Sequence, residues 1–465
     1  MKTLYIPSTI NIKELALKHN PPLNHDYSVY ILSLINSIPE WNEQMLRRNN
    51  GYTIINSTIL QSWVHDYRNY LKHFISEGII ETDHTYIVEE KSFGYRFTRE
   101  HAISDLVPVE ISKYTLCKRL HQRASTGDFK YPYLKKWFDT GSLEFDYTSA
   151  IEFLSMYRDV NLPKAKTEAE IRNIMNGYNL NVIASMRLNQ REYWFRVDST
   201  GRRLHTNLTN IKSELRNFIT YQGQELVSID IKNSQPYLST GILKENYYSN
   251  TTNNTMQIPT NTTINSTVDN NIMLEESELS QCSRGIQPLD VANYIQQVKE
   301  GTLYEYYLDG LFLLLGKQYT RSRAKELFLT CLYSDDHLAS FKEKDVFMLL
   351  FPSVYKVFKA IKGDDYSQLA IQLQRLESSL ILDVIAKRIS REKRSMPLFT
   401  IHDSIVCPIG KEEYVKAVMT EELHKALKIE PRVAFNYWRP EEAYETLSTP
   451  LPETITTTLS YNPYL

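Results

Sequence analysis

The sequence is poor in cysteine and carries no excess of charge of either sign. Its four cysteines among 465 residues are spaced for neither a zinc site nor a disulfide framework. This usage is typical of a reduced cytoplasmic protein. The formal net charge of −2 excludes the overall basic character of proteins that coat nucleic acid. Contact with nucleic acid would depend on local basic stretches at residues 113–123, 130–136 and 387–394.

Long hydrophobic runs are also missing. No stretch of about 18 apolar residues is present, and the N-terminus lacks the apolar segment of a signal peptide. We therefore expect a cytoplasmic protein with no membrane partner. The 42% hydrophobic and 12% aromatic content supports a packed core, and the length allows two or three domains.

Two short apolar stretches each run directly into an aspartate. Residues 226–229 precede Asp230, and residues 398–402 precede Asp403. Both read as strands that present a carboxylate at their end. Paired carboxylates of this kind hold two divalent cations about 3.5–4 Å apart for phosphoryl transfer. Either aspartate alone is more typical of an ordinary strand end or turn, because aspartate often closes strands through its own backbone hydrogen bonds.

A basic helix is predicted between the two aspartates, over residues 321–333. Arg321 and Lys325 are four residues apart, so they share one face and can meet a triphosphate together. Tyr333 lies near the same face and offers a ring on which a base can stack. The same pattern in isolation is more typical of a solvated basic helix with a core tyrosine.

These segments resemble the motifs of family A DNA polymerases and single-subunit RNA polymerases. Asp230 lies in a motif A-like segment, residues 321–333 resemble motif B, and Asp403 lies in a motif C-like segment. Upstream, residues 199–211 resemble the family's Thr-Gly-Arg…Asn-Leu-x-Asn-Ile segment, with one extra arginine. The four matches occur in the family's order and span about residues 190–440.

The resemblance implies an α+β right-hand polymerase with an antiparallel palm sheet and helical fingers and thumb. It implies two Mg²⁺ ions, with Mn²⁺ as an alternative, held by Asp230, Asp403 and the carbonyl of Ile231. Its partners would be a DNA primer-template and dNTPs, with rNTPs as the alternative substrate. The resemblance also implies that Arg321 and Lys325 bind the triphosphate, and that Lys325 is catalytic. Tyr333 would stack on a base and Gln235 would contact the sugar. The implied primer contacts are Arg202 or Arg203, His402 and Gln374.

The chain departs from the family pattern at three positions, and two of these departures leave the sugar preference open. Gln235 stands where family A DNA polymerases carry a glutamate that crowds the sugar 2′ position. Ser404 follows the motif C aspartate, as in the single-subunit RNA polymerases. Ser334 follows Tyr333 where the family usually has glycine, so the local backbone is expected to bend differently.

The chain before these motifs predicts a small winged-helix-like domain at residues 1–105. Apolar periodicity predicts one helix over Thr58–Glu77, stopped by Gly78, and two strands follow within residues 79–88 and 91–97. Such a domain can place a helix in the DNA major groove, or it can dock a partner protein. Residues 106–190 predict a helical connector or thumb.

Three later segments complete the predicted organisation, in which residues 191–440 form the palm and fingers. Residues 247–285 are rich in Asn, Thr and Ser and predict a disordered insertion. A long helix is predicted over residues 366–388, with Gln374 as the counterpart of the family's primer-contacting glutamine. Residues 441–465 predict a loose tail.

Two other functions remain open at this point. One is an RNA polymerase or primase on the same palm. The other is a DNA-binding replication factor without catalysis. A small polymerase with an N-terminal winged helix and no Asp-x-Glu exonuclease motif is typical of a plasmid, phage or other mobile element. Such an element would supply a replication initiator or helicase as partner.

Overall fold

The computed structural model describes residues 1–41, 46, 49–87, 91–124, 129–243, 288–335 and 341–448. The chain divides into two compact units. Among the described residues, the first comprises those within 1–196, 205–225 and 438–448, and the second those within 197–204 and 226–437. Both contain helices and antiparallel strands, so the α+β class is confirmed. The predicted insertion at 247–285 lies outside the described residues.

The first unit has an N-terminal lobe of short strands and helices around one hydrophobic core. Strands β1 and β5 form an antiparallel pair, and β2, β4 and β3 form a three-stranded sheet in that order. The elements of this lobe are β1 (Lys2–Pro7), α1 (Ile12–Leu17), α2 (His25–Trp41), β2 (Thr53–Ile54), α4 (Ser57–Trp63), α5 (Tyr67–Ser76), β3 (Ile80–Thr82), β4 (Gly94–Phe97), α6 (Arg99–Ala102), β5 (Leu106–Ile111) and α7 (Tyr114–Ala124).

The prediction of one helix over Thr58–Glu77 is wrong, because this segment forms two helices. Helix α4 ends at Trp63, Val64 is extended at φ −134° and ψ 102°, and α5 begins at Tyr67. The Val64 side chain is buried, 1% exposed. Because the break is short, the apolar faces of both helices pack on the same core. The apolar periodicity of the sequence therefore continues through the break and does not reveal it. The two strands predicted after the helix are confirmed as the shorter β3 and β4.

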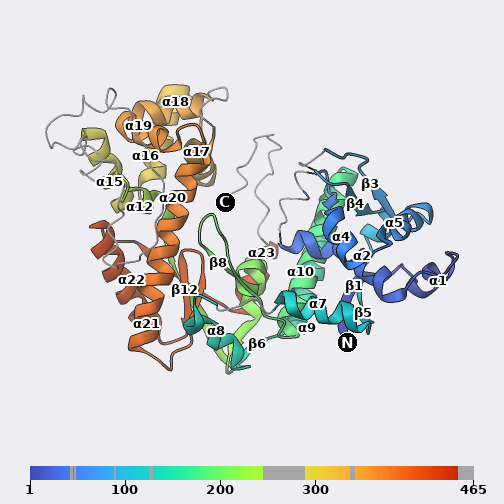
Figure 1. The fold of residues 1–465 in the computed structure, drawn as a ribbon. Coiled ribbons are helices and arrows are strands. Elements are labelled where there is room, and N and C mark those ends of the chain that lie inside the picture. The colour runs from blue at the N-terminus through green and yellow to red at the C-terminus, as the bar shows by residue number, and fades with distance from the viewer. Residues whose placement is uncertain are drawn as a thin grey trace. The chain divides into compact units, whose positions relative to one another are not determined.

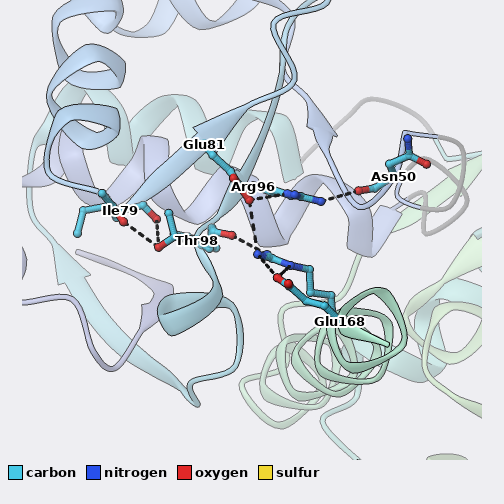
Figure 2. Close-up of polar contacts among 9 residues, drawn as sticks. Asn50, Ile79, Glu81, Arg96, Thr98 and Glu168 are labelled. Carbon is cyan, nitrogen blue, oxygen red and sulfur yellow. Dashed lines mark hydrogen bonds and ion pairs between the residues drawn. The ribbon is translucent and has the colours of Figure 1, made fainter. Parts of the chain in front are cut away.

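Charged side chains join the three-stranded sheet to a long helix of the same unit, α10 (Glu168–Asn189) (Figure 2). Arg172 on α10 lies 3.5 Å from Glu81 and 3.0 Å from Glu168. Arg96 on β4 donates to Glu81 at 2.8 Å and to the carbonyl of Asn50 at 2.9 Å. The strands β3 and β4 are therefore held against the start of α10.

The rest of the first unit is mostly helical, as predicted for residues 106–190. Helices α9 and α10 pack on each other. The predicted loose tail begins later than Glu441, because α23 forms with Ala443 fully buried and Tyr444 against Phe153 and Phe218. The elements are α8 (Pro132–Asp139), β6 (Leu143–Phe145), α9 (Tyr147–Asn161), α11 (Asn207–Asn210), β9 (Ile219–Tyr221) and α23 (Pro440–Ser448).

In the second unit, strand β10 lies between β12 and β13, and β11 pairs with the other edge of β12, all antiparallel. The helices α15 to α19 pack into one group (Figure 1), in which aromatic rings such as Tyr294, Phe328 and Phe347 are fully buried. The elements are β10 (Gln224–Ile231), α12 (Ser234–Ser239), α15 (Leu289–Glu300), α16 (Leu303–Leu315), α17 (Arg321–Tyr333), α18 (Lys342–Leu350), α19 (Pro352–Lys362), β11 (Phe399–Ile401), β12 (Ser404–Pro408), α22 (Glu412–Leu427) and β13 (Val433–Tyr437).

The long helix predicted over residues 366–388 is confirmed, and its middle segment is π-helical. It runs as α20 (Ser367–Ser378), a π-helical segment (Ser379–Ala386) and α21 (Lys387–Glu392). Short π-helical segments inside α-helices occur often at functional sites. None of the described helices is both long and apolar enough to cross a bilayer.

Candidate functional site

The structure brings Asp230 and Asp403 to neighbouring strands of the second unit. Asp230 is the penultimate residue of β10, and Asp403 lies in the two-residue turn between β11 and β12. In the ladder of β10 and β12, Asp230 pairs with Ser404, the residue directly after Asp403. The two carboxylates therefore come from adjacent backbone positions across one strand pair.

Polar side chains surround the Asp230 carboxylate. The Ser228 hydroxyl lies 3.2 Å from both of its oxygens, and Asn436 on β13 donates its amide to Oδ2. Burial raises the pKa of Asp230 above its usual range, the charge of Asp403 raises it further, and hydrogen bonds from Ser404, Asn436 and Ser228 oppose both effects. Two partly buried carboxylates with these neighbours are poised to accept a cation, which would offset their repulsion.

The raised pKa of Asp230 gives a test of this repulsion. A carboxyl whose pKa is raised by folding stabilises the protein below its ordinary pKa, and that contribution is lost as the pH rises through the raised value. Asp403→Asn removes one cause of the increase. We therefore expect the metal-free variant to be more stable than the wild type at pH 7.5 by about 1 kcal/mol, with a smaller difference near pH 4.

Thermal unfolding in EDTA at both pH values measures this effect. Asp364→Asn is the matched control, because Asp364 is an exposed aspartate of the same unit. A lower unfolding temperature for Asp403→Asn than for the wild type at pH 7.5 would show that the two carboxylates do not repel.

The turn that carries Asp403 is strained. His402 has φ of 52°, in the left-handed region that side chains other than glycine seldom adopt. Hairpin turns of two residues that need positive φ at the first position usually have glycine there. Strain of this kind persists where the surrounding structure enforces it, as at many active sites. His402 is thus held beside Asp403 at a cost in backbone energy.

A buried network connects four further residues of the second unit. Glu377 on α20 is 1% exposed and receives two hydrogen bonds from Arg203, from Nε at 2.8 Å and Nη2 at 3.0 Å. Gln235 donates Nε2 to Glu377 at 2.9 Å, and its Oε1 accepts the Tyr333 hydroxyl at 2.6 Å. Three residues predicted from the sequence, Arg203, Gln235 and Tyr333, are therefore linked through a fourth that was not predicted.

Burial sets the electrostatics of this network. Burial raises the pKa of Glu377 above its usual range, Arg203 opposes this effect, and the charge of Asp403 adds to it. Burial also raises the pKa of Tyr333, which stays a neutral hydrogen-bond donor. The charge of Asp403 therefore acts on Glu377 as well as on Asp230.

The two candidate arginines lie in the loop between β7 (Phe195–Val197) and β8 (Leu204–Thr206), and their side chains differ in exposure. Arg202 is exposed with φ of 58°, whereas Arg203 points to Glu377. Gly201 packs on Gln374 so closely that a Cβ there would lie 2.5 Å from the Gln374 Oε1 atom. Gln374 is 4% exposed. Arg202 is therefore the arginine of this pair that faces solvent.

The helix predicted over residues 321–333 is confirmed as α17 with those bounds. Arg321 and Lys325 are both exposed, and Arg321 donates to Glu305 at 2.6 Å. Tyr333 at the end of the helix is 3% exposed. The two cations are accessible to a ligand, while the tyrosine is held in place by its hydroxyl.

The end of α17 is held by a buried lysine. Lys362 on α19 is 2% exposed and donates to the carbonyls of Cys331 at 3.2 Å and Ser334 at 2.9 Å. Ser334 is extended, at φ −73° and ψ 154°, and needs no glycine there. A cation at a helix C-terminus is favoured by the helix dipole. Lys362 thus fixes the turn in which Tyr333 lies.

Removal of this cation is expected to destabilise the protein. Lys362→Met keeps most of the side-chain volume but leaves one buried and one partly buried carbonyl group without this donor, at an expected cost of about 2–3 kcal/mol in the free energy of unfolding. Chemical denaturation measures the loss. Lys359→Met on the exposed side of α19 is the control and should change stability by less than about 0.5 kcal/mol. Equal effects of both substitutions would rule out the capping role.

The site residues Glu377, Asn436 and Ser228 were not predicted from the sequence. Glu377 lies in an ordinary helical pattern, and Asn436 lies in a strand 206 residues from Asp230. Among the described residues, no group of three or more His, Cys, Asp or Glu side chains could hold a metal ion. Any cation here would rely on Asp230, Asp403 and non-carboxylate oxygens such as the carbonyl of Ile231, which is in β10 next to Asp230.

No family model matches the sequence, and no curated protein matches it. Among solved structures, the chain is similar to the POL domain of Pol1 from M. smegmatis in complex with DNA primer-template and dNTP. The match covers 70% of this chain and 73% of that chain, with 10% identity and a TM-score of 0.40. A similarity this low leaves the function to be inferred from the residues of the site.

Proposed function

We propose that this chain is a template-directed nucleotidyltransferase, a DNA-directed DNA polymerase that extends a 3′-hydroxyl. The observation that carries the proposal is the pairing of β10 with β12, which sets Asp230 beside the turn of Asp403. Nucleotidyl transfer needs two ionised carboxylates at one point, with cations at the triphosphate. The charge of Asp403 raises the pKa of Asp230, as expected of neighbouring carboxylates.

The oxygen donors at this point fit Mg²⁺, which prefers carboxylate and carbonyl oxygens. Asp230, Asp403 and the carbonyl of Ile231 would hold it, with Mn²⁺ as an alternative. Bound there, such ions would lower the pKa of a primer hydroxyl and offset charge on the leaving pyrophosphate. Asn436 and Ser228 orient the Asp230 carboxylate by their hydrogen bonds.

The remaining residues of the site bind and orient the substrates. Arg321 and Lys325, exposed on one side of α17, bind the triphosphate and offset the charge that develops on it. Tyr333 lies near the nascent base pair and Gln235 lies against the sugar, in orientations set by their mutual hydrogen bond. Arg202 and His402 contact the primer strand. Gln374 and Arg203, which are largely buried, support the hairpin and the network around it.

The N-terminal lobe of the first unit is proposed to be the winged-helix domain, within residues 1–105. Its order of α2, β2, α4, α5, β3 and β4, with a β2-β4-β3 sheet, is typical of winged helices. Residues 106–190 would serve as connector or thumb, and residues 191–440 as palm and fingers. The element that carries this protein would be a plasmid, phage or other mobile element, with an initiator or helicase as partner.

Primer extension with dNTPs and rNTPs in parallel tests the proposed function. The 465-residue chain is incubated with a primed DNA template and Mg²⁺. Extension with dNTPs supports the DNA polymerase, and extension with rNTPs alone would replace it with an RNA polymerase or primase. Extension with neither from folded protein would reject a nucleotidyltransferase.

A further inference from the structure

Glu377 is a buried carboxylate that the proposed roles do not use. It is 1% exposed on α20 and lies between a cation and an amide. Its Oε1 accepts from Nε of Arg203, and its Oε2 accepts from both Nη2 of Arg203 and Nε2 of Gln235. A buried carboxylate is costly unless it is paired and hydrogen-bonded in this way. Glu377 can therefore be buried here because Arg203 and Gln235 donate hydrogen bonds to it.

The hydrogen bonds around Gln235 leave its amide one orientation. Both oxygens of Glu377 accept hydrogen bonds from Arg203, so the group of Gln235 that faces Oε2 is its NH₂. The Gln235 oxygen then faces the Tyr333 hydroxyl, which donates to it at 2.6 Å. With both ends engaged, Gln235 is fixed between α20 and α17. A rotation of its amide would set NH₂ against OH and oxygen against carboxylate.

Gln235 is also the position at which this chain departs from the polymerase motif, where a glutamate is usual. In this structure the buried negative charge lies instead on the residue that Gln235 contacts. We propose that Glu377 is a positioning residue that supplies this charge in place of residue 235, holds Gln235 and Arg203, and thereby sets the discrimination between deoxyribonucleotides and ribonucleotides. This inference rests on the proposed function, because it assigns Gln235 to the sugar of the incoming nucleotide.

The exchange of charge between positions 235 and 377 makes the proposal testable by a double-mutant cycle. Glu377→Gln deprives Arg203 of its ionised acceptor and frees the Gln235 amide to rotate. Gln235→Glu places two carboxylates in contact. In the double variant Q235E/E377Q, the residue 377 amide can donate to the residue 235 carboxylate, which still accepts from Tyr333. The link between residues 235 and 377 is then restored with the charge moved by one residue, and Arg203 keeps its hydrogen bond from Nε to the residue 377 oxygen but loses the one from Nη2.

The measured quantity is the ratio of kcat/KM for a dNTP to that for the matching rNTP, in single-nucleotide extension of a primed DNA template. We expect each single substitution to lower this ratio by about tenfold and the double variant to recover most of it. Unfolding temperatures of the same four proteins should follow the same order. Glu392→Gln is the matched control, because Glu392 is an exposed glutamate on α21 paired with Arg388.

The outcomes separate this inference from the proposed function. Primer extension by the wild type, with the same sugar ratio in folded Glu377→Gln, would overturn the role of Glu377 and leave the polymerase intact. Losses that simply add in the double variant would overturn the exchange of charge. A folded wild type that extends no primer with either nucleotide would overturn the proposed function and the role of Glu377 with it.

Discussion

Asp230→Asn and Asp403→Asn are each expected to lower the rate of primer extension by about a thousandfold or more. An asparagine keeps the size of the side chain and one acceptor oxygen, but it removes the negative charge that the chemistry requires. A thousandfold loss corresponds to about 4 kcal/mol of transition-state stabilisation, which is within the contribution of metal-ligating carboxylates.

Steady-state extension of a labelled primer measures this loss. Asp364→Asn, on an exposed loop, controls for the loss of one negative charge and should retain nearly full activity. Circular dichroism and thermal unfolding confirm that each variant is folded. A folded carboxylate variant that keeps a tenth of the wild-type rate would contradict the assignment of the catalytic pair.

Lys325→Ala is expected to lower kcat by about a hundredfold, with a smaller change in KM. The reason is that Lys325 offsets charge that grows on the triphosphate in the transition state, and loss of such a group typically costs about 10²–10³-fold. Arg321→Ala should raise KM more than it lowers kcat, because Arg321 already pairs with Glu305 and mainly binds the ground state.

The control for both substitutions lies on the same helix. Arg323→Ala removes a cation that pairs with Glu326 and lies two residues from Arg321, away from the shared face of Arg321 and Lys325. Its kcat and KM should stay within about twofold of the wild-type values. An equal effect of all three substitutions would indicate that α17 contributes only general positive charge.

The local elements of the site could be predicted because local sequence determines them. The apolar runs before Asp230 and Asp403 form strands β10 and β11, and helix α17 begins and ends at the predicted residues. The helix break at Val64 was missed because the apolar residues of both helices follow one continuous helical spacing. The tail was assigned as loose from Glu441, yet Ala443 and Tyr444 pack on distant residues that composition does not reveal.

The contacts that organise the site could not be predicted, because they join residues far apart in the chain. Glu377 follows Arg375 and Leu376 in a pattern typical of a half-exposed helix, and its burial depends on Arg203, 174 residues earlier. The sequence could not choose between Arg202 and Arg203 for the same reason. The close contact of Gly201 with Gln374 fixes the hairpin so that Arg202 faces solvent and Arg203 faces Glu377.

The most direct test of the central claim is extension of a primed DNA template by the purified 465-residue chain with Mg²⁺ and dNTPs. The carboxylate pair and the cationic side chains of Arg321 and Lys325 predict template-directed addition of nucleotides to the primer 3′ end. This addition should be lost in Asp230→Asn and in Asp403→Asn. No addition by folded wild-type protein with either Mg²⁺ or Mn²⁺, or addition that persists in both variants, would contradict the claim.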